Sequence, residues 1–216
     1  MIEVPLIGIS RLRFNIDGKG ITTLVAFHGC QLNCKYCLNP QCLKGDAVKS
    51  YYSSQKVYEI LRKDELYFLA TNGGATFGGG EPLLKVDFIK EILELGAKRW
   101  HTTIETSLNV PLFNLEKLFP YINEYIVDIK DMNPTIYKAY TGFNNDNVLN
   151  NLKWLINKGK SENILCRIPL IPEYNTQESM YFSKARLEDI GIHRFEMFKY
   201  ITDVSNKNKS VNNQQI

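Results

Sequence analysis

Apolar runs alternate with segments of helical periodicity along most of this chain, and this alternation limits the possible folds more than any other feature. Strands that alternate with helices are typical of βαβ units and a parallel sheet. Rules of handedness and connection length leave few topologies for such a chain. About six strand–helix units fit the pattern. The sequence therefore predicts an α/β fold, a partial (β/α)6 barrel with an open parallel sheet.

The expected elements follow one another with short connections. Gly96 lies directly after one helical segment, where a glycine commonly ends a helix. In parallel sheets, ligands bind at the carboxyl ends of the strands. The expected strands are residues 22–27, 75–77, 102–105, 125–130, 164–171 and 195–198. The expected helices are residues 55–63, 86–95, 112–119, 147–157 and 177–187.

A chain of 216 residues with 44% apolar and 23% charged residues can bury a sizeable core. We expect a single domain over residues 1–203, followed by a polar, disordered tail over residues 204–216. No stretch is long and apolar enough to cross a bilayer, and residues 1–13 lack the features of a secretory signal. The net charge is +3, without a basic run. We therefore expect a cytoplasmic protein with no membrane or nucleic-acid partner.

Three cysteines, Cys30, Cys34 and Cys37, lie in one short segment. Three such thiolates suit a metal cluster with one vacant position, because soft thiolates select zinc, copper(I) or iron–sulfur clusters. Five cysteines are an odd number, which indicates a reducing compartment rather than a disulfide framework. Two alternatives remain: a structural zinc site completed by Cys42 or His28, and a closed four-cysteine cluster that uses Cys42.

A glycine triplet comes directly after the second expected strand. Gly78, Gly79 and Gly80 are followed there by Glu81 and Pro82. Glycines at a strand end let the backbone approach a bound molecule, because no Cβ stands in the way. A triplet of this kind is by itself more often a flexible turn.

Charged and polar side chains lie at the ends of later strands. Glu105 and Thr106 end one strand, and Asp128 and Lys130 end the next. Each of them, taken singly, reads as an ordinary surface residue. Arg167 interrupts an apolar strand, and a buried guanidinium needs a partner or a cavity. A carboxylate of a substrate or cofactor is the expected partner, and an Arg at an exposed rim is the alternative.

The C-x3-C-x2-C spacing, with Tyr36 before the last cysteine and the glycine motif downstream, resembles the signature of the radical SAM superfamily. In that family three cysteines hold a 4Fe–4S cluster, and the unligated iron chelates the amino and carboxylate groups of S-adenosylmethionine. Electron transfer then yields a 5′-deoxyadenosyl radical. The resemblance implies cluster ligands at Cys30, Cys34 and Cys37, adenine packing by Tyr36, and binding of the cofactor amino group by Gly78, Gly79, Gly80 and Glu81.

From about residue 7 to residue 175 the chain is also similar to the activating enzymes of glycyl-radical enzymes, the family of pyruvate formate-lyase activating enzyme. Asp128 and Lys130 match its Asp-x-Lys motif. Glu105 replaces the Asp that precedes Thr106 at a monovalent cation site in that family. The resemblance implies that Asp128, Lys130 and Arg167 bind polar groups of the cofactor. Beyond residue 175 the match fades, and the histidine that the family carries near its last strand is absent.

The function implied is abstraction of a hydrogen atom from a backbone glycine of a partner glycyl-radical enzyme. A flavodoxin- or ferredoxin-type protein would supply the electron. An alternative within the superfamily is epimerisation or crosslinking of a ribosomally made peptide. The non-enzyme alternative is a metal-binding module with structural zinc or a closed iron–sulfur cluster. No further cysteine clusters follow Cys37, so a single cluster is expected.

Overall fold

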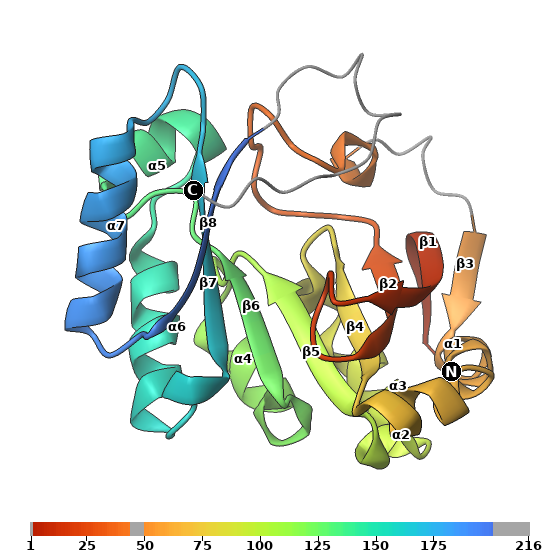
Figure 1. Ribbon diagram of the computed structural model, residues 1–216. Coiled ribbons are helices and arrows are strands. Elements are labelled where there is room, and N and C mark those ends of the chain that lie inside the picture. Colours follow the sequence, from red (N-terminus) through yellow and green to blue (C-terminus); the bar gives the residue numbers. More distant parts are fainter. Residues whose placement is uncertain (1, 44–49, 201–216) are drawn as a thin grey trace. The chain divides into compact units, whose positions relative to one another are not determined.

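The computed structural model describes residues 2–43 and 50–200. Its strands are β1 (Glu3–Phe14), β2 (Ile21–Phe27), β3 (Ser50–Ser53), β4 (Gly74–Gly79), β5 (His101–Thr106), β6 (Glu124–Asp128), β7 (Ile164–Leu170) and β8 (Arg194–Lys199). They hydrogen-bond in the order β3-β1-β2-β4-β5-β6-β7-β8 (Figure 1). β1 is antiparallel to β2 and β3, whereas β2, β4 and β5 run parallel, as do β7 and β8. The result is an open, mixed and mostly parallel sheet.

Helices connect most of these strands. The α-helices are α1 (Ser54–Arg62), α2 (Glu65–Thr71), α3 (Val86–Glu94), α4 (Leu112–Leu118), α5 (Pro134–Thr141), α6 (Asp146–Asn157) and α7 (Gln177–Asp189). Short 3-10 turns are η1 (Pro40–Leu43), η3 (Pro82–Lys85), η4 (Ala97–Arg99), η5 (Phe119–Tyr121) and η6 (Ser161–Asn163). No helix of the described residues is long and apolar enough to cross a membrane.

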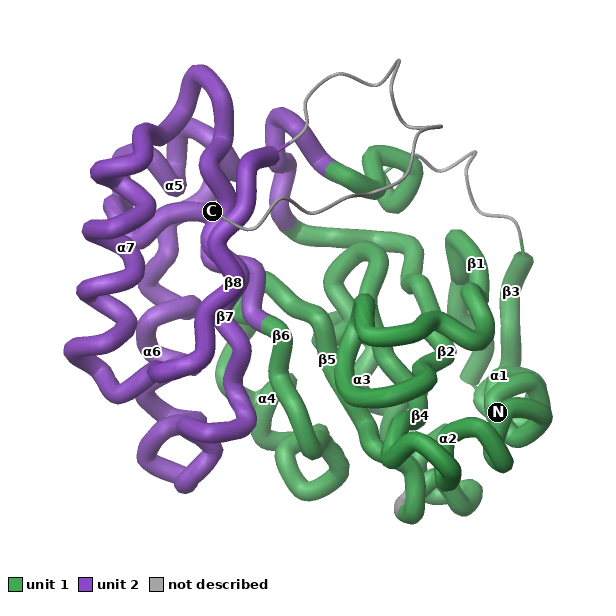
Figure 2. Tube along the Cα trace, in the orientation of Figure 1, with its two compact units in different colours: residues 1–31, 38–126 green, residues 32–37, 127–216 purple. Residues whose placement is uncertain are grey.

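The chain divides into two compact units. Unit 1 comprises residues 1–31 and 38–126, and unit 2 comprises residues 32–37 and 127–216 (Figure 2). The segment 32–37, which carries two of the three clustered cysteines, therefore belongs to unit 2, whereas Cys30 belongs to unit 1. The expectation of a single domain over residues 1–203 stays a prediction, and the expected tail lies outside the described residues.

Unit 1 has a core of aromatic and aliphatic side chains between its parallel strands and helices. Phe27 lies 6.2 Å from Phe77 and 6.0 Å from Phe88, measured between ring centroids, and all three are almost fully buried. Helix α3 also packs against α1 and α4. Burial of each such ring stabilises the fold by about 1.5–3 kcal/mol relative to an exposed side chain.

Trp100, directly before β5, packs against helices α1 and α2 of unit 1. Its ring stacks on Tyr58 at 5.7 Å and meets Phe68 edge-on at 5.4 Å. Its Nε1 donates a hydrogen bond of 2.8 Å to Glu65, so the buried indole has a polar partner. These contacts fix α1 and α2 against the segment that enters β5.

Unit 2 is built on β7 and β8, with α7 packed against β7. Successive side chains of β7 point to opposite faces, which places Cys166 and Ile168 in the core. Burial raises the pKa of the Cys166 thiol to about 12, so this cysteine packs as a small hydrophobe. Leu155 of α6 and Leu187 of α7 are fully buried as well.

Local capping explains where several helices begin and end. Asn133 accepts hydrogen bonds from the first backbone N–H groups of α5, Pro134 occupies its first turn, and Gly142 ends it with a φ of 84°. Thr176 caps α7 in the same way. Gly96, with a φ of 137°, follows α3 as the sequence predicts.

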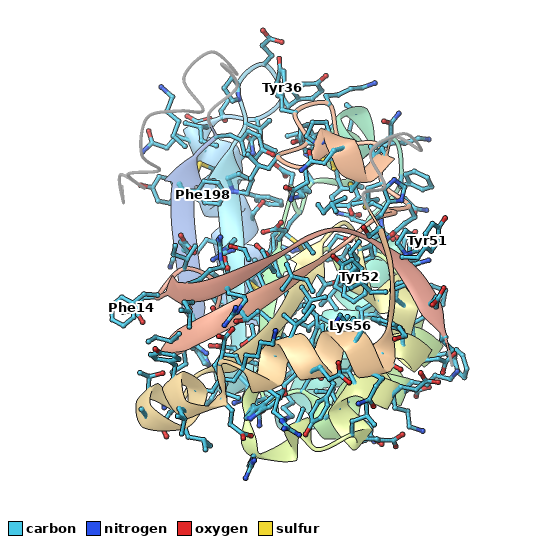
Figure 3. The ribbon with its side chains drawn as sticks, turned by 90° about the vertical axis from the view of Figure 1, so that its right-hand side faces the viewer. Phe14, Tyr36, Tyr51, Tyr52, Lys56 and Phe198 are labelled. Atoms are coloured by element: carbon cyan, nitrogen blue, oxygen red, sulfur yellow. The ribbon has the colours of Figure 1, made fainter. Side chains whose placement is uncertain are left out.

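Every strand and helix expected from the sequence is present, with ends shifted by a few residues at most. Two strands and two α-helices of the described residues were not anticipated, namely β1, β3, α2 and α5. β1 and β3 extend the parallel sheet with an antiparallel edge, and β3 is the terminal strand. Tyr51 of β3 and Phe14 at the end of β1 project outward (Figure 3), with exposed fractions of 65% and 64%.

Candidate cofactor site

The glycine turn, residues 78–80, lies between β4 and η3 in unit 1. Each of its glycines is placed in surroundings that a side chain would disturb in a different way. A Cβ on Gly78 would lie 2.9 Å from Oε2 of Glu105 on the neighbouring strand. Gly79 has a φ of 92°, which L side chains rarely adopt. A Cβ on Gly80 would lie 2.2 Å from the carbonyl oxygen of Gly29. The backbone conformation at Gly79 and the close approach of Gly29 to Gly80 thus require glycine, so the triplet is not a generic flexible turn.

We predict that Gly80→Ala destabilises the protein by about 1–3 kcal/mol, because a backbone oxygen cannot move aside as a side chain can. Gly8→Ala is the matched control, since Gly8 of β1 has no atom within 4 Å of an added Cβ. We expect that control to be neutral or stabilising by up to about 1 kcal/mol. Thermal unfolding of both variants measures the difference, and equal unfolding temperatures would contradict the prediction.

Glu81 is buried and accepts four hydrogen bonds within unit 1. Thr106 Oγ1 donates at 2.6 Å, Ser107 donates through its N–H at 3.0 Å and its hydroxyl at 2.7 Å, and the N–H of Leu83 donates at 3.2 Å. Burial raises the pKa of Glu81, and the bonds from Thr106 and Ser107 offset part of that rise. This carboxylate therefore joins the glycine turn to the end of β5.

The glycine turn is also bound to the residues that lead into Cys30. The N–H of Gly80 donates to the carbonyl of Phe27 at 2.9 Å, and the N–H of Glu81 donates to the carbonyl of Gly29 at 2.8 Å. Gln31 donates a hydrogen bond of 2.6 Å from Nε2 to the carbonyl of Asn109, in the loop after β5. Unit 1 thus brings together Cys30, the glycine turn and the β5 end, as the parallel topology predicts.

The cysteine segment of unit 2 is held through its backbone to the end of α5. The N–H of Asn33 donates to the carbonyl of Thr141 at 3.0 Å, and the N–H of Lys35 donates to the carbonyl of Tyr140 at 3.2 Å. These two bonds flank Cys34 and fix its position within the unit. Cys34 and Cys37 are partly exposed.

Lys130 lies close to a carboxylate and a thiol in unit 2. Its Nζ is 3.1 Å from Oδ2 of Asp128. Burial alone would lower the pKa of Lys130, but Asp128, with Cys34 and Tyr200, raises it well above its usual value. Burial raises the pKa of Cys34, and the Lys130 ammonium opposes that rise. A cation fixed here favours a thiolate at Cys34 and can attract a carboxylate of a ligand.

The loop that carries Lys130 is fixed by a buried polar network. Asp131 accepts hydrogen bonds from the N–H of Asn133 at 2.8 Å and from Nδ2 of Asn175 at 3.2 Å. The N–H of Met132 donates to the hydroxyl of Ser183 on α7 at 2.9 Å. The sequence did not single out this network, although Asp131 adjoins the Asp-x-Lys motif.

Tyr36 makes contacts with the loop after β7. Its hydroxyl donates a hydrogen bond of 2.7 Å to Glu173, which raises the pKa of Tyr36. Its ring meets Tyr174 edge-on at 5.8 Å, and Tyr174 meets Tyr140 in the same manner at 5.2 Å. Tyr36 is labelled at the top of Figure 3. Its expected packing against adenine stays a prediction.

Arg167 has a protein partner in unit 2. Its Nε donates a hydrogen bond of 2.7 Å to Oε2 of Glu196, which lies directly opposite on β8 in the parallel register. The two side chains are 15% and 23% exposed, so the pair is largely buried. Arg167 therefore pairs with a carboxylate of the chain itself rather than with the expected substrate or cofactor carboxylate, and binding of a cofactor group by Arg167 stays a prediction.

All five cysteines lie in the described part of the chain, and none is in a disulfide. Cys42 is 1% exposed, unlike the three clustered cysteines. Among the described residues, no three His, Cys, Asp or Glu side chains gather around the position of one metal ion. A cubane cluster takes one thiolate per iron, so its ligands need not converge in this way.

The sequence is similar to families and proteins of known activity. The profile of the Radical SAM superfamily matches residues 24–182. The (2S)-3-sulfopropanediol dehydratase activating enzyme of Klebsiella oxytoca is 37% identical over 76% of this chain and 70% of its own length. The pyruvate formate-lyase-activating enzyme of Streptococcus mutans is 30% identical over 87% of this chain and 74% of its own length.

The fold also has relatives among solved structures. SuiB of Streptococcus suis, in its structure bound to S-adenosylmethionine, superposes with a TM-score of 0.60 at 19% identity. That match covers 89% of this chain and 44% of SuiB, so this chain spans less than half of that protein. The likeness supports the fold alone. The match over residues 24–182, with the two activating enzymes, identifies the chain as a member of the radical SAM superfamily and, within it, as an activating enzyme of glycyl-radical enzymes.

Proposed function

We propose that this chain takes a hydrogen atom from one backbone glycine of a partner glycyl-radical enzyme. The bound cofactor would supply a 5′-deoxyadenosyl radical. The hydrogen atom of the target Cα–H bond would pass to its 5′ carbon, which gives 5′-deoxyadenosine, and the unpaired electron would remain on the glycine. The observation that carries the proposal is the binding of the glycine turn to the residues before Cys30, through the 2.8 Å bond from Glu81 to Gly29. That contact joins the two sequence motifs that the chemistry requires.

The residues present fit the cofactors that the superfamily uses, a 4Fe–4S cluster and S-adenosylmethionine. Cys30, Cys34 and Cys37 are reduced and partly exposed, as cluster ligands must be before assembly. Gly79 and Gly80 provide a turn without side chains at a strand end. When bound, the cluster supplies the electron that cleaves S-adenosylmethionine to methionine and a 5′-deoxyadenosyl radical.

The chain's own residues would bind and orient the cofactor. Carbonyl groups of the glycine turn would accept hydrogen bonds from its amino group, and the Lys130 ammonium would attract its carboxylate. Glu81 would act by shaping the turn, because its four acceptor contacts lie within the protein. Asp128 would hold Lys130 in place through the 3.1 Å ion pair. Tyr36 would pack by the adenine. Arg167, held by its hydrogen bond to Glu196, would bind a polar group of the cofactor.

We further propose a monovalent cation near Glu105 and Thr106. Oε2 of Glu105 lies beside Gly78, so a carboxylate oxygen is present near the end of β5. Binding of S-adenosylmethionine should weaken severalfold when K⁺ and Na⁺ are replaced by tetramethylammonium, which is too large for such a site. Equal affinity in both salts would contradict the assignment. Equilibrium dialysis under anaerobic conditions measures it.

The electron is proposed to come from a flavodoxin- or ferredoxin-type protein in the cytoplasm, where cysteines stay reduced. The test of the function uses the anaerobically reconstituted enzyme, S-adenosylmethionine, a reductant and a candidate glycyl-radical enzyme. We expect stoichiometric 5′-deoxyadenosine and a protein-based radical in the partner, seen by electron paramagnetic resonance. A glycine-to-alanine substitution at the target residue of the partner should remove the radical. A fully loaded cluster that yields no 5′-deoxyadenosine would defeat the proposal.

A further inference from the structure

The segment after the last cysteine reaches the glycine turn through one side chain. Asn39 donates a hydrogen bond of 3.1 Å from Nδ2 to the carbonyl oxygen of Gly79. Both residues belong to unit 1, and the contact is partly buried. Asn39 lies two positions after Cys37, and the sequence alone assigns it no role.

This bond acts on the peptide group between Gly79 and Gly80. The Gly79–Gly80 peptide is flanked by two glycines, and glycines tolerate backbone conformations that other residues do not. Its N–H donates to the carbonyl of Phe27 at 2.9 Å, and its carbonyl accepts from Asn39. The first bond is between backbone groups, whereas the second depends entirely on the amide of Asn39.

Asn39 is itself fixed by a circuit of backbone hydrogen bonds. Its carbonyl accepts from the N–H of Cys42 at 2.9 Å, the carbonyl of Cys42 accepts from the N–H of Gly29 at 2.9 Å, and the carbonyl of Gly29 accepts from Glu81 at 2.8 Å. The circuit closes through the bond from Asn39 to Gly79. These hydrogen bonds connect the 3-10 turn η1, the residues before Cys30 and the glycine turn to one another.

We propose that Asn39 is a positioning residue for the amino group of S-adenosylmethionine, acting through the Gly79 carbonyl. The inference rests on the proposed function. A carbonyl oxygen has two lone pairs, so the bond from Asn39 leaves one for a ligand donor. By fixing the peptide plane, Asn39 aims that second lone pair before the ligand arrives, which reduces the ordering cost of binding.

The experiment measures binding by equilibrium dialysis to the reconstituted holoenzyme, without reductant, so that no turnover occurs. Asn39→Ala should weaken S-adenosylmethionine binding about three- to tenfold, the usual net contribution of one hydrogen bond. An analogue that lacks the α-amino group should bind the variant and the parent enzyme equally. A purely structural defect would weaken both ligands alike and would overturn the proposal, as would unchanged affinity for S-adenosylmethionine.

Two further variants make the result unambiguous. Asn39→Asp keeps the shape but cannot donate to the Gly79 carbonyl, so it should lose at least as much affinity as Asn39→Ala. Asn114→Ala is the matched control, because Asn114 Nδ2 donates a bond of 2.7 Å to the Leu83 carbonyl in the same unit. We expect that control to bind both ligands normally. Tighter binding of S-adenosylmethionine by Asn39→Ala would mean that Asn39 competes with the ligand, which contradicts a positioning role. A parent enzyme that binds neither ligand would instead refute the proposed function.

Discussion

We expect the Cys34→Ala variant to form no detectable 5′-deoxyadenosine after anaerobic reconstitution. Each clustered cysteine would supply one thiolate to one iron, and alanine offers no replacement ligand. Removal of groups that merely support a metal ligand costs about 10- to 100-fold in metal affinity or activity, so loss of the ligand itself should exceed about 100-fold. Bound iron and sulfide, measured together with product, should fall in parallel.

Cys42→Ala is the control for this variant. Cys42 is buried, and alanine would retain the hydrogen bonds of its backbone N–H to Asn39 and of its carbonyl to Gly29. We expect cleavage of S-adenosylmethionine within about twofold of the parent enzyme, as for a small buried side chain shortened by one atom. Equal losses in Cys34→Ala and Cys42→Ala would indicate a closed cluster with four cysteine ligands, and the proposed function would fail.

Glu81→Ala is expected to be the most destabilising substitution in the glycine turn. It would leave the Thr106 hydroxyl, both donors of Ser107 and the N–H of Leu83 without their acceptor. Each buried donor without a partner costs about 1–3 kcal/mol, and relaxation recovers part of that, so we expect a loss of about 3–5 kcal/mol. For a chain of this length the unfolding temperature should fall by about 10 °C, measured by scanning calorimetry.

Two variants calibrate that loss. Glu81→Gln keeps one acceptor oxygen but turns an NH2 group toward donors, so its destabilisation should lie between those of the parent and Glu81→Ala. Glu116→Ala removes an exposed carboxylate from α4 and should change the free energy of unfolding by less than about 0.5 kcal/mol. If Glu81→Ala unfolded at the same temperature as Glu116→Ala, the hydrogen bonds to Glu81 would contribute nothing to stability.

The parallel part of the fold could be predicted because its strands are buried on both faces and read as apolar runs. β4 is buried over its first five residues, for example. β1 gave no such signal, because only Val4 and Leu6 among its residues are buried. It also pairs antiparallel with β2 and β3 and so stands outside the strand–helix alternation. α2 was missed because its apolar residues do not lie on one face: Phe68 is buried, whereas Leu66 and Leu69 are exposed.

The sequence proposes candidate site residues but does not show which residues they contact. It predicted a substrate or cofactor carboxylate as the partner of Arg167, whereas the register of β7 and β8 places Glu196 of the same chain opposite it. The spacing of the glycine motif could not show that Glu81 turns toward Ser107, since that contact depends on how β5 ends. Asn39 precedes a proline in a short turn, a pattern that ordinarily suggests only local structure.

The stacked Trp100 has a practical consequence for following the folding of this enzyme. The sequence contains two tryptophans, and the division into compact units assigns Trp100 to unit 1 and Trp154 of α6 to unit 2. Variants that keep one indole each, Trp154→Phe and Trp100→Phe, would let fluorescence report separately on the melting of each half of the chain. Coincident transitions would establish one cooperative domain, and staggered transitions would reveal two folding units that share a single polypeptide.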